Sequence, residues 1–552
     1  MKRFACLVLL VCLAVLANAA ADDEHHGHHD AAEQLGTVSF PTSCSPAVQQ
    51  PFQRAVALMH SFWYEEAEKQ FSDVAAADPR CAIAHWGIAL SLYHQLWDRP
   101  QDPTLKRGWE EIQKAQTIGA KTDRERDYIN ALAQFYRDPA SKDHQQRATA
   151  YAQAMEKLYA KYPQDREAGA FDALSLLASA PLNDRTSANE RKAVAVLMPL
   201  FRQDPNHPGL AHYIIHACDS PQMASMGLEA ARRYSQIASS SPHAVHMPSH
   251  IFARLGLWQD DIESNLKSVA LTRQAAAMHM GGASHQLHAM DFLVYAYLQT
   301  GEDEPAKQIV DGLPATIAEI KSGHAHDVMM DHSGYALAQF PALYALEMHH
   351  WSDAAALEIP AGIRPLDQVI TVWARVVGAG HLRNAEAARK DLQQFDSLVE
   401  SVRKSKNAYL ADLLTGVPRD EMAAWVAFTE KKNEDAIRLM RRAADRQDAE
   451  GKGEVEIPAR EMLADMLLEM NRPTEALAEY EQSMKVDPNR FNGLYGAARS
   501  AELAGEMAKA SSYYATLVKN CAHARSDRPE LARARTVLAK YSVRTTAATN
   551  NR

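Results

Sequence analysis

Histidines are concentrated in the middle of this 552-residue chain. Fourteen of the 24 histidines fall within the 144 residues 207–350. Within this stretch His212 and His216 are four residues apart, as are His246 and His250. In a helix this spacing places both imidazoles on one face. Such pairs commonly bind zinc, copper or iron, so the spacing predicts a transition-metal site.

Two aspartates and a further histidine stand near these pairs. Asp219 comes three residues after His216, and His288 and Asp291 are also three residues apart. The aspartates could be metal ligands, partners that orient an imidazole, or general bases. The candidate metal set is therefore His212, His216, His246, His250, His288, Asp219 and Asp291.

Three more residues are candidates for binding a ligand beside the metal. Arg254 follows His250 by one helical turn and could hold an anionic group. His243 and His285 are assigned to ligand binding with it. Two readings without metal stay open. The groove could bind a polar ligand through neutral histidines, or the histidines could form a pH-sensitive packing layer.

These side chains need helices to position them, and the sequence contains a helical repeat. Two small residues, then an aromatic four positions after the second, recur with a period of 34, as in Ala464, Ala476, Tyr480 and Pro488 followed by Ala498, Ala510, Tyr514 and Ala522. This pattern resembles the tetratricopeptide repeat (TPR). Small residues let two helices approach, and the aromatic fills the gap against the next repeat. Because sustained period-two alternation is absent, we expect an all-α, TPR-type α-α superhelical solenoid.

The resemblance also implies where the histidines lie. The second histidine pair occupies the places that the first pair holds one repeat earlier. In TPR proteins these places in the first helix of a repeat line the concave groove. Residues 243–252 are, in addition, similar to an HxxHMPSHIF-like segment of exported bacterial TPR proteins of unassigned function. That similarity transfers no chemistry.

The N-terminus predicts export. Residues 1–19 have a positive start, a short apolar run and a small-x-small end, which is typical of a signal peptide. No later segment is long and apolar enough to span a membrane. We therefore expect a periplasmic or secreted protein. Export permits disulfides, and Cys44 and Cys81 flank the first expected hairpin, so we expect them to pair.

The rest of the chain divides into four expected parts. Residues 20–41 form a flexible histidine-rich segment, and residues 42–400 form an N-terminal TPR array with the histidine-rich groove. Residues 401–541 form a plainer C-terminal array, and residues 542–552 a tail.

Composition and missing motifs narrow the function. The net charge of −10 and the lack of a basic stripe argue against nucleic acid as a partner. HExxH, GxSxG, Walker and CxxC motifs are absent. We expect a peptide, a protein or a small polar ligand to bind in a histidine-lined groove that holds copper, zinc or iron. A metal-dependent hydrolase or oxidase in the groove and a pure protein–protein interaction scaffold are the alternatives. The sequence leaves open whether the protein is an enzyme.

Overall fold

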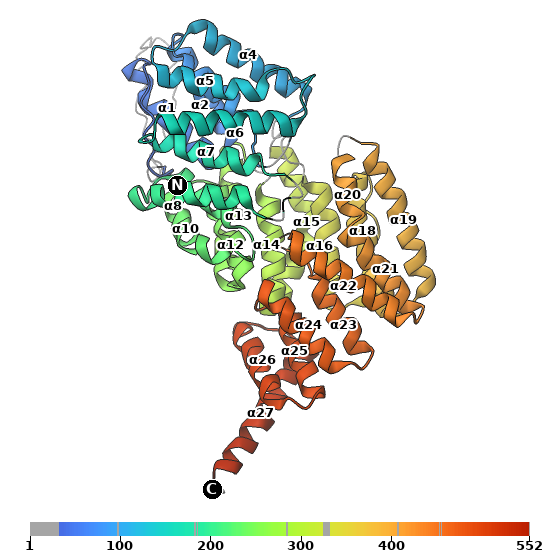
Figure 1. Cartoon of the computed structure of the whole chain (residues 1–552). Coiled ribbons are helices and arrows are strands. Elements are labelled where there is room, and N and C mark those ends of the chain that lie inside the picture. Colours follow the sequence, from blue (N-terminus) through green and yellow to red (C-terminus); the bar gives the residue numbers. More distant parts are fainter. Residues whose placement is uncertain are drawn as a thin grey trace, which may run out of the picture. The chain divides into compact units, whose positions relative to one another are not determined.

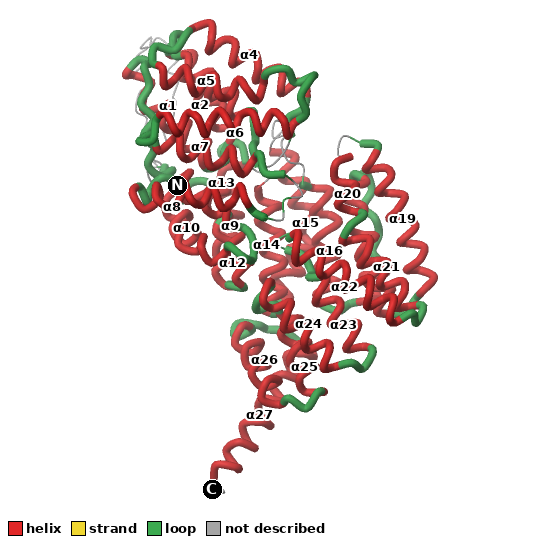
Figure 2. The backbone as a smooth tube through the Cα atoms, in the orientation of Figure 1, coloured by secondary structure: helices red, strands yellow, loops and turns green. Residues whose placement is uncertain are grey.

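The described part of the chain is helical from end to end (Figures 1 and 2). The computed structural model describes residues 33–96, 99–181, 184, 186–282, 285–323, 332–405, 408–451, 453 and 455–550. Within these ranges every regular element is a helix and none is a strand. The expected signal peptide, residues 1–19, and most of the histidine-rich segment after it lie outside these ranges.

The helices up to the middle of the chain are η1 (Pro46–Val48), α1 (Gln49–His60), α2 (Tyr64–Ala77), α3 (Ala82–Ser91), α4 (Asp102–Ile118), α5 (Asp123–Tyr136), α6 (His144–Lys161), α7 (Arg166–Ala178), α8 (Ala188–Gln203), α9 (Pro208–Cys218), α10 (Ala224–Ile237), α11 (Pro242–His246), α12 (Pro248–Leu255), α13 (Trp258–Ala277), α14 (His285–Thr300) and α15 (Asp303–Gly323).

The remaining helices are α16 (Ser333–Glu347), α17 (Trp351–Ala356), α18 (Pro365–His381), α19 (Ala385–Arg403), η2 (Ala408–Leu410), α20 (Ala411–Leu414), α21 (Val417–Thr429), α22 (Asn433–Glu450), α23 (Ala459–Glu469), α24 (Pro473–Val486), α25 (Phe491–Leu503), α26 (Met507–Asn520) and α27 (Pro529–Asn550).

Consecutive helices pair and then stack, which is the packing expected of TPR units. α1 packs against α2, α2 against α3, and so on along the chain. The first helices of successive pairs also meet, as α1 does with α3, α7 with α9 and α12 with α14. Each unit thus contacts its neighbours, as in a solenoid. The prediction of an all-α, TPR-type solenoid is confirmed.

The aromatic residues of the 34-residue repeat pack against small residues of the next helix, as the repeat pattern predicted. The ring of Phe71 in α2 fills the space beside Gly87 in α3, so a Cβ at Gly87 would overlap it. Tyr480 in α24 and Gly496 in α25 repeat this contact. A close-packed interior cannot absorb an extra atom without shifting its neighbours.

Gly496→Ala is therefore expected to destabilise the protein by about 1–3 kcal/mol, because its Cβ would meet the Tyr480 ring. Gly312 in α15 is a matched control, since a Cβ there meets nothing within 4 Å. Gly312→Ala should stabilise by about 0.5–1 kcal/mol, through helix propensity alone. Urea denaturation followed by circular dichroism measures both. Equal effects of the two substitutions would contradict this packing.

Two contacts between helices far apart in sequence shape the middle of the chain. α1 packs against α9, and α14 packs against α25. The first contact brings the end of α1 to the histidines of α9. The second contact includes a buried ion network around Arg490, which donates to Glu461 and Glu347.

Three other expectations concern a disulfide, membrane spans and the boundary between the two arrays. Cys44 and Cys81 are joined by a disulfide. None of the described helices is long and apolar enough to cross a membrane. Near residue 401, η2 and α20 follow α19, while α18 packs directly against α21. The division into arrays at residues 42–400 and 401–541 stays a prediction.

Candidate metal centre

Prolines begin three of the helices that carry the histidines. Pro208 starts α9, Pro242 starts α11 and Pro248 starts α12. Proline suits a first helical turn, because its missing N–H would have no partner there. Pro248 has no N–H to continue the hydrogen bonding of α11. Helix α11 therefore ends at His246, and Met247 separates it from α12. A new helix starts at Pro248.

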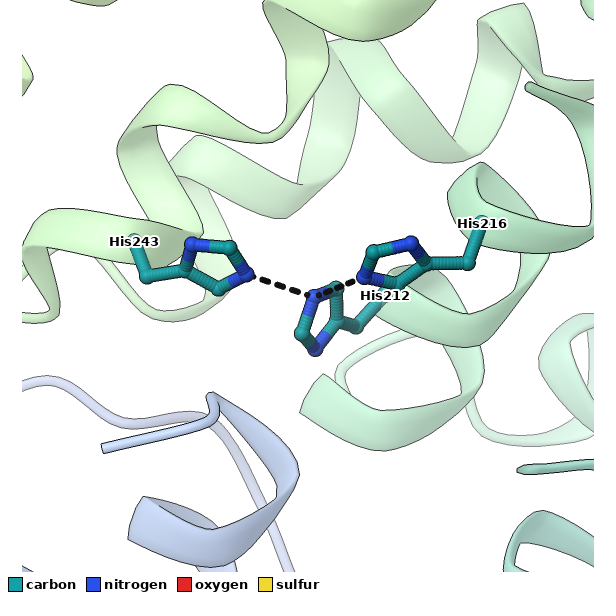
Figure 3. Close-up of side chains that lie close together, drawn as sticks. All are labelled: His212, His216 and His243. Atoms are coloured by element: carbon teal, nitrogen blue, oxygen red, sulfur yellow. Dashed lines mark hydrogen bonds between the residues drawn. The ribbon is translucent and has the colours of Figure 1, made fainter. Parts of the chain in front are cut away.

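The first group of histidines joins α9 and α11. The Nε2 atom of His212 lies 3.1 Å from that of His216 and 3.2 Å from that of His243 (Figure 3). In Figure 3 the three rings point toward one another across the space between their helices. We call His212, His216 and His243 the first trio. The sequence assigned His243 to ligand binding, whereas the structure places its ring among the candidate metal ligands.

The second group joins α11, α12 and α14. The Nε2 atoms of His246 and His250 are 3.0 Å apart. The ring of His288 lies 4.5 Å from that of His246, measured between centroids, and 5.5 Å from that of His250. We call His246, His250 and His288 the second trio. In each trio, one ligand atom per residue can be chosen so that all lie within 4.8 Å of one another.

The two trios adjoin. Ring centroids of His216 and His250 are 6.3 Å apart, and those of His243 and His246 are 6.0 Å apart. The four histidines that the sequence paired therefore do converge, but they divide between two neighbouring groups. We call the two trios together the six-histidine centre.

In three of these histidines the Nδ1 atom, the ring nitrogen that takes no part in the Nε2 contacts, donates a hydrogen bond to an oxygen. Nδ1–H of His212 donates to the backbone carbonyl of His60 at 2.6 Å, and that of His250 donates to the Asp219 carboxylate at 2.9 Å. Nδ1–H of His246 donates to the side-chain oxygen of Asn265 at 2.6 Å. These oxygens can only accept, so the proton sits on Nδ1 and the lone pair of the neutral ring on Nε2. Metal-binding histidines are typically oriented in this way.

With the proton on Nδ1, the short distances between Nε2 atoms indicate whether a cation could lie between them. His246 and His250 both carry their proton on Nδ1, so their Nε2 lone pairs face each other at 3.0 Å. Two lone pairs at this distance repel unless a proton or a cation lies between them. Two nitrogens on a tetrahedral ion, each bonded at about 2.0–2.1 Å, would be about 3.3 Å apart. The observed separations are therefore close to those of a shared ion.

Burial favours the neutral form of His212 and His243. His212, His243 and His246 are at most 3 % exposed. Desolvation lowers the pKa of His212 well below its ordinary value, and His216 beside it lowers this pKa further. Desolvation and His285 do the same to the pKa of His243. Neutral imidazole is the form that ligates a metal.

The remaining candidates stand around the centre. Asp219 accepts from His250 through one oxygen and from Nε of Arg254, at 2.9 Å, through the other. Of the three roles open to it, this geometry is that of an orienting partner. Asp291 accepts a 3.0 Å hydrogen bond from Tyr335 and belongs to neither trio. The ring of His285 lies 4.9 Å from that of His243.

The sequence analysis missed Asn265, in α13. Its amide nitrogen donates to Asp261 at 2.7 Å, which turns its oxygen toward His246. No sequence pattern marks this residue, because it faces His246 only through the packing of α11 on α13.

A third group, formed by His60, Glu167 and His207, meets the same distance criterion but has a different hydrogen-bond pattern. Both nitrogens of His60 have oxygen partners, Glu167 at 2.7 Å and the Tyr213 hydroxyl at 2.9 Å. His207 binds Glu167 through Nε2 and accepts the backbone N–H of Leu210 through Nδ1. Since every ring nitrogen is satisfied, this group is a structural network that joins α1, α7 and α9.

A cavity of about 800 Å³ opens beside the six-histidine centre. His216, Asp219 and Arg254 are among the residues that line it. The lining also includes apolar side chains, among them Val369, Ile370, Trp373, Phe395 and Val417. A molecule in this cavity could therefore reach the first trio through His216.

Comparisons with known proteins give only remote matches. No protein-family model matches the chain, and no curated protein matches its sequence. Similar solved structures include the human IFIT1 dimer with m7Gppp-AAAA, at 12 % identity and a TM-score of 0.37, covering 79 % of this chain and 90 % of that one. The structure of Naa15/Naa10 bound to HypK-THB has 12 % identity and a TM-score of 0.20, covering 90 % of this chain and 74 % of that one.

TM-scores below 0.5 mark a distant likeness of structure. The helix order and packing of the chain itself identify it as an all-α solenoid of the TPR type.

Proposed function

We propose that this chain is an exported metalloprotein whose six-histidine centre binds two transition-metal ions, one in each trio. The supporting observation is the 3.0 Å contact between the Nε2 atoms of His246 and His250, whose Nδ1 atoms both donate to oxygens. A cation relieves the repulsion that this contact otherwise implies. Export rests on the pattern of residues 1–19.

The charge that the buried centre would have to hold, rather than the type of ligand, favours copper in its cuprous state. Imidazole suits zinc, copper, iron and nickel, and no carboxylate belongs to either trio among the described residues. Two divalent ions among neutral ligands would bring four positive charges into buried surroundings. Two cuprous ions would bring two, and burial penalises each charge.

A ligand could bind to the metal ions of the centre. Three protein ligands to an ion leave a coordination position open, which is typical of catalytic rather than structural sites. The cavity beside His216 gives a ligand access to that position. We therefore propose ligand binding in a metal-containing cavity as the function. Metal-dependent catalysis is the second candidate, because each trio has three ligands rather than four.

Metal analysis of the purified protein tests the proposal. The chain should be expressed with residues 1–19 and without an affinity tag, and its metal content measured by inductively coupled plasma mass spectrometry. We expect two ions per chain, and copper in particular. Two zinc ions would contradict the preference for copper and leave the two-ion centre standing. Protein that binds neither metal after dialysis against each would contradict the centre itself.

A further inference from the structure

The two trios of the six-histidine centre have the same composition. Each contains two histidines four residues apart, His212 with His216 and His246 with His250, and each is completed by a third histidine from a later helix. Two ions of one metal would therefore have equivalent ligands, three imidazoles each. Equivalent ligands favour the same oxidation state in both ions, so each ion can give up one electron as readily as the other.

The two trios form one site. Ring centroids are 6.0 Å apart between His243 and His246 and 6.3 Å apart between His216 and His250. Ions of two-metal sites lie about 3.5–4 Å apart, a separation that one small ligand can span. Three protein ligands leave an open position on each ion. A molecule of two atoms that binds both ions would fill both open positions at once.

The burial of the centre limits the reactions that its ions can undergo. Two cuprous ions bring two positive charges into surroundings where every net charge is costly. Dioxygen that takes one electron from each ion becomes peroxide, with two negative charges, while both ions become cupric. The total charge stays at two, so this reaction adds no net charge to the buried centre. An acceptor that took both electrons away would instead leave four positive charges there.

Dioxygen can enter the centre, whereas a larger molecule meets only its edge. Among the described residues, His216 is the member of the centre that lines the adjoining cavity. His212, His243 and His246 are at most 3 % exposed. A small uncharged molecule enters a protein interior at little cost, because it has no charge to desolvate.

We infer that the six-histidine centre, loaded with two cuprous ions, binds dioxygen between them and reduces it to peroxide. Each ion gives one electron, and the double bond of dioxygen becomes the single bond of peroxide. Release of hydrogen peroxide then takes up two protons and leaves two cupric ions. The inference rests on the proposed function, since it assigns a substrate to the same two ions.

Oxygen uptake tests the inference on the full-length protein, loaded with cuprous ions under nitrogen. We expect about one dioxygen to be consumed for two copper ions, and about one hydrogen peroxide to be released when acid is added afterwards. Two cupric ions that share a peroxide are magnetically coupled, so the oxygenated protein should give no electron paramagnetic resonance signal. No uptake, or the full signal of two independent cupric ions, would overturn the inference.

Substitutions that remove one ion distinguish a shared reaction from two independent ones. A single cuprous ion gives one electron, which takes dioxygen only to superoxide. The initial rate of uptake should therefore fall at least about tenfold in both His250→Ala and His212→Ala, rather than by half. His523→Ala, outside both trios, should keep the full rate. A rate that is merely halved in either folded variant would overturn the inference.

Metal content measured on the same samples separates this inference from the proposed function. Zinc has no redox chemistry, so zinc-loaded protein should hold two ions and consume no dioxygen. Protein that holds two cuprous ions and takes up no dioxygen would overturn the inference and leave the two-ion centre standing. Protein that holds no metal would overturn both.

Discussion

Replacing His250 by alanine should lower the metal content of the protein from two ions per chain to one. His250 supplies one of the three Nε2 atoms of the second trio, and its own orientation depends on Asp219. Loss of a mere orienting partner typically weakens metal binding by roughly 10–100-fold, so loss of the ligand should weaken it at least as much. The measurement is the metal content after equilibration with a chelator of known affinity.

Variants of other histidines control for this result. His212→Ala should remove the ion of the first trio and leave that of the second. His523 is exposed and belongs to neither trio, so His523→Ala should retain both ions. Circular dichroism establishes that each variant is folded. A folded His250→Ala protein that still holds two ions would contradict a role of the second trio in metal binding.

Replacing Arg490 by methionine should destabilise the protein by about 3–5 kcal/mol. Arg490 is buried and donates to Glu461 at 2.8 Å and to Glu347 at 2.7 Å. Its removal leaves two buried carboxylates without their cation, in the region where α14 meets α25. An uncompensated buried charge costs far more than a surface pair contributes. Urea denaturation followed by tryptophan fluorescence gives the change in unfolding free energy.

A surface ion pair and the pH dependence sharpen this test. Arg438 pairs with Asp435 at 3.0 Å, and both are exposed, so Arg438→Met should change stability by no more than about 1 kcal/mol.

Burial raises the pKa of Glu461. Without Arg490 this pKa rises further, so the folded variant binds protons more readily than its unfolded chain. The deficit of Arg490→Met should therefore be smaller at pH 5 than at pH 8. A deficit that grows as the pH falls would contradict the assignment.

Local patterns in the sequence were enough to predict the fold class and to identify most of the histidines of the centre. The 34-residue period of small residues and aromatics reflects contacts between neighbouring helices, as between Phe71 and Gly87. Such contacts repeat along the chain and so leave a periodic trace. The four-residue spacing of His212 and His216 likewise acts within a single helix. Both features can be read without knowing how distant segments meet.

Only the tertiary structure decided how the histidines are grouped and oriented. His243 joins the first trio from the short helix α11, and the second trio is completed by His288 from α14. The acceptors of His212 and His246 are the carbonyl of His60 and the side chain of Asn265. Such contacts depend on crossing angles that accumulate over several hairpins, as where α1 meets α9. Because that accumulation is a property of the whole stack, no short stretch of sequence records it.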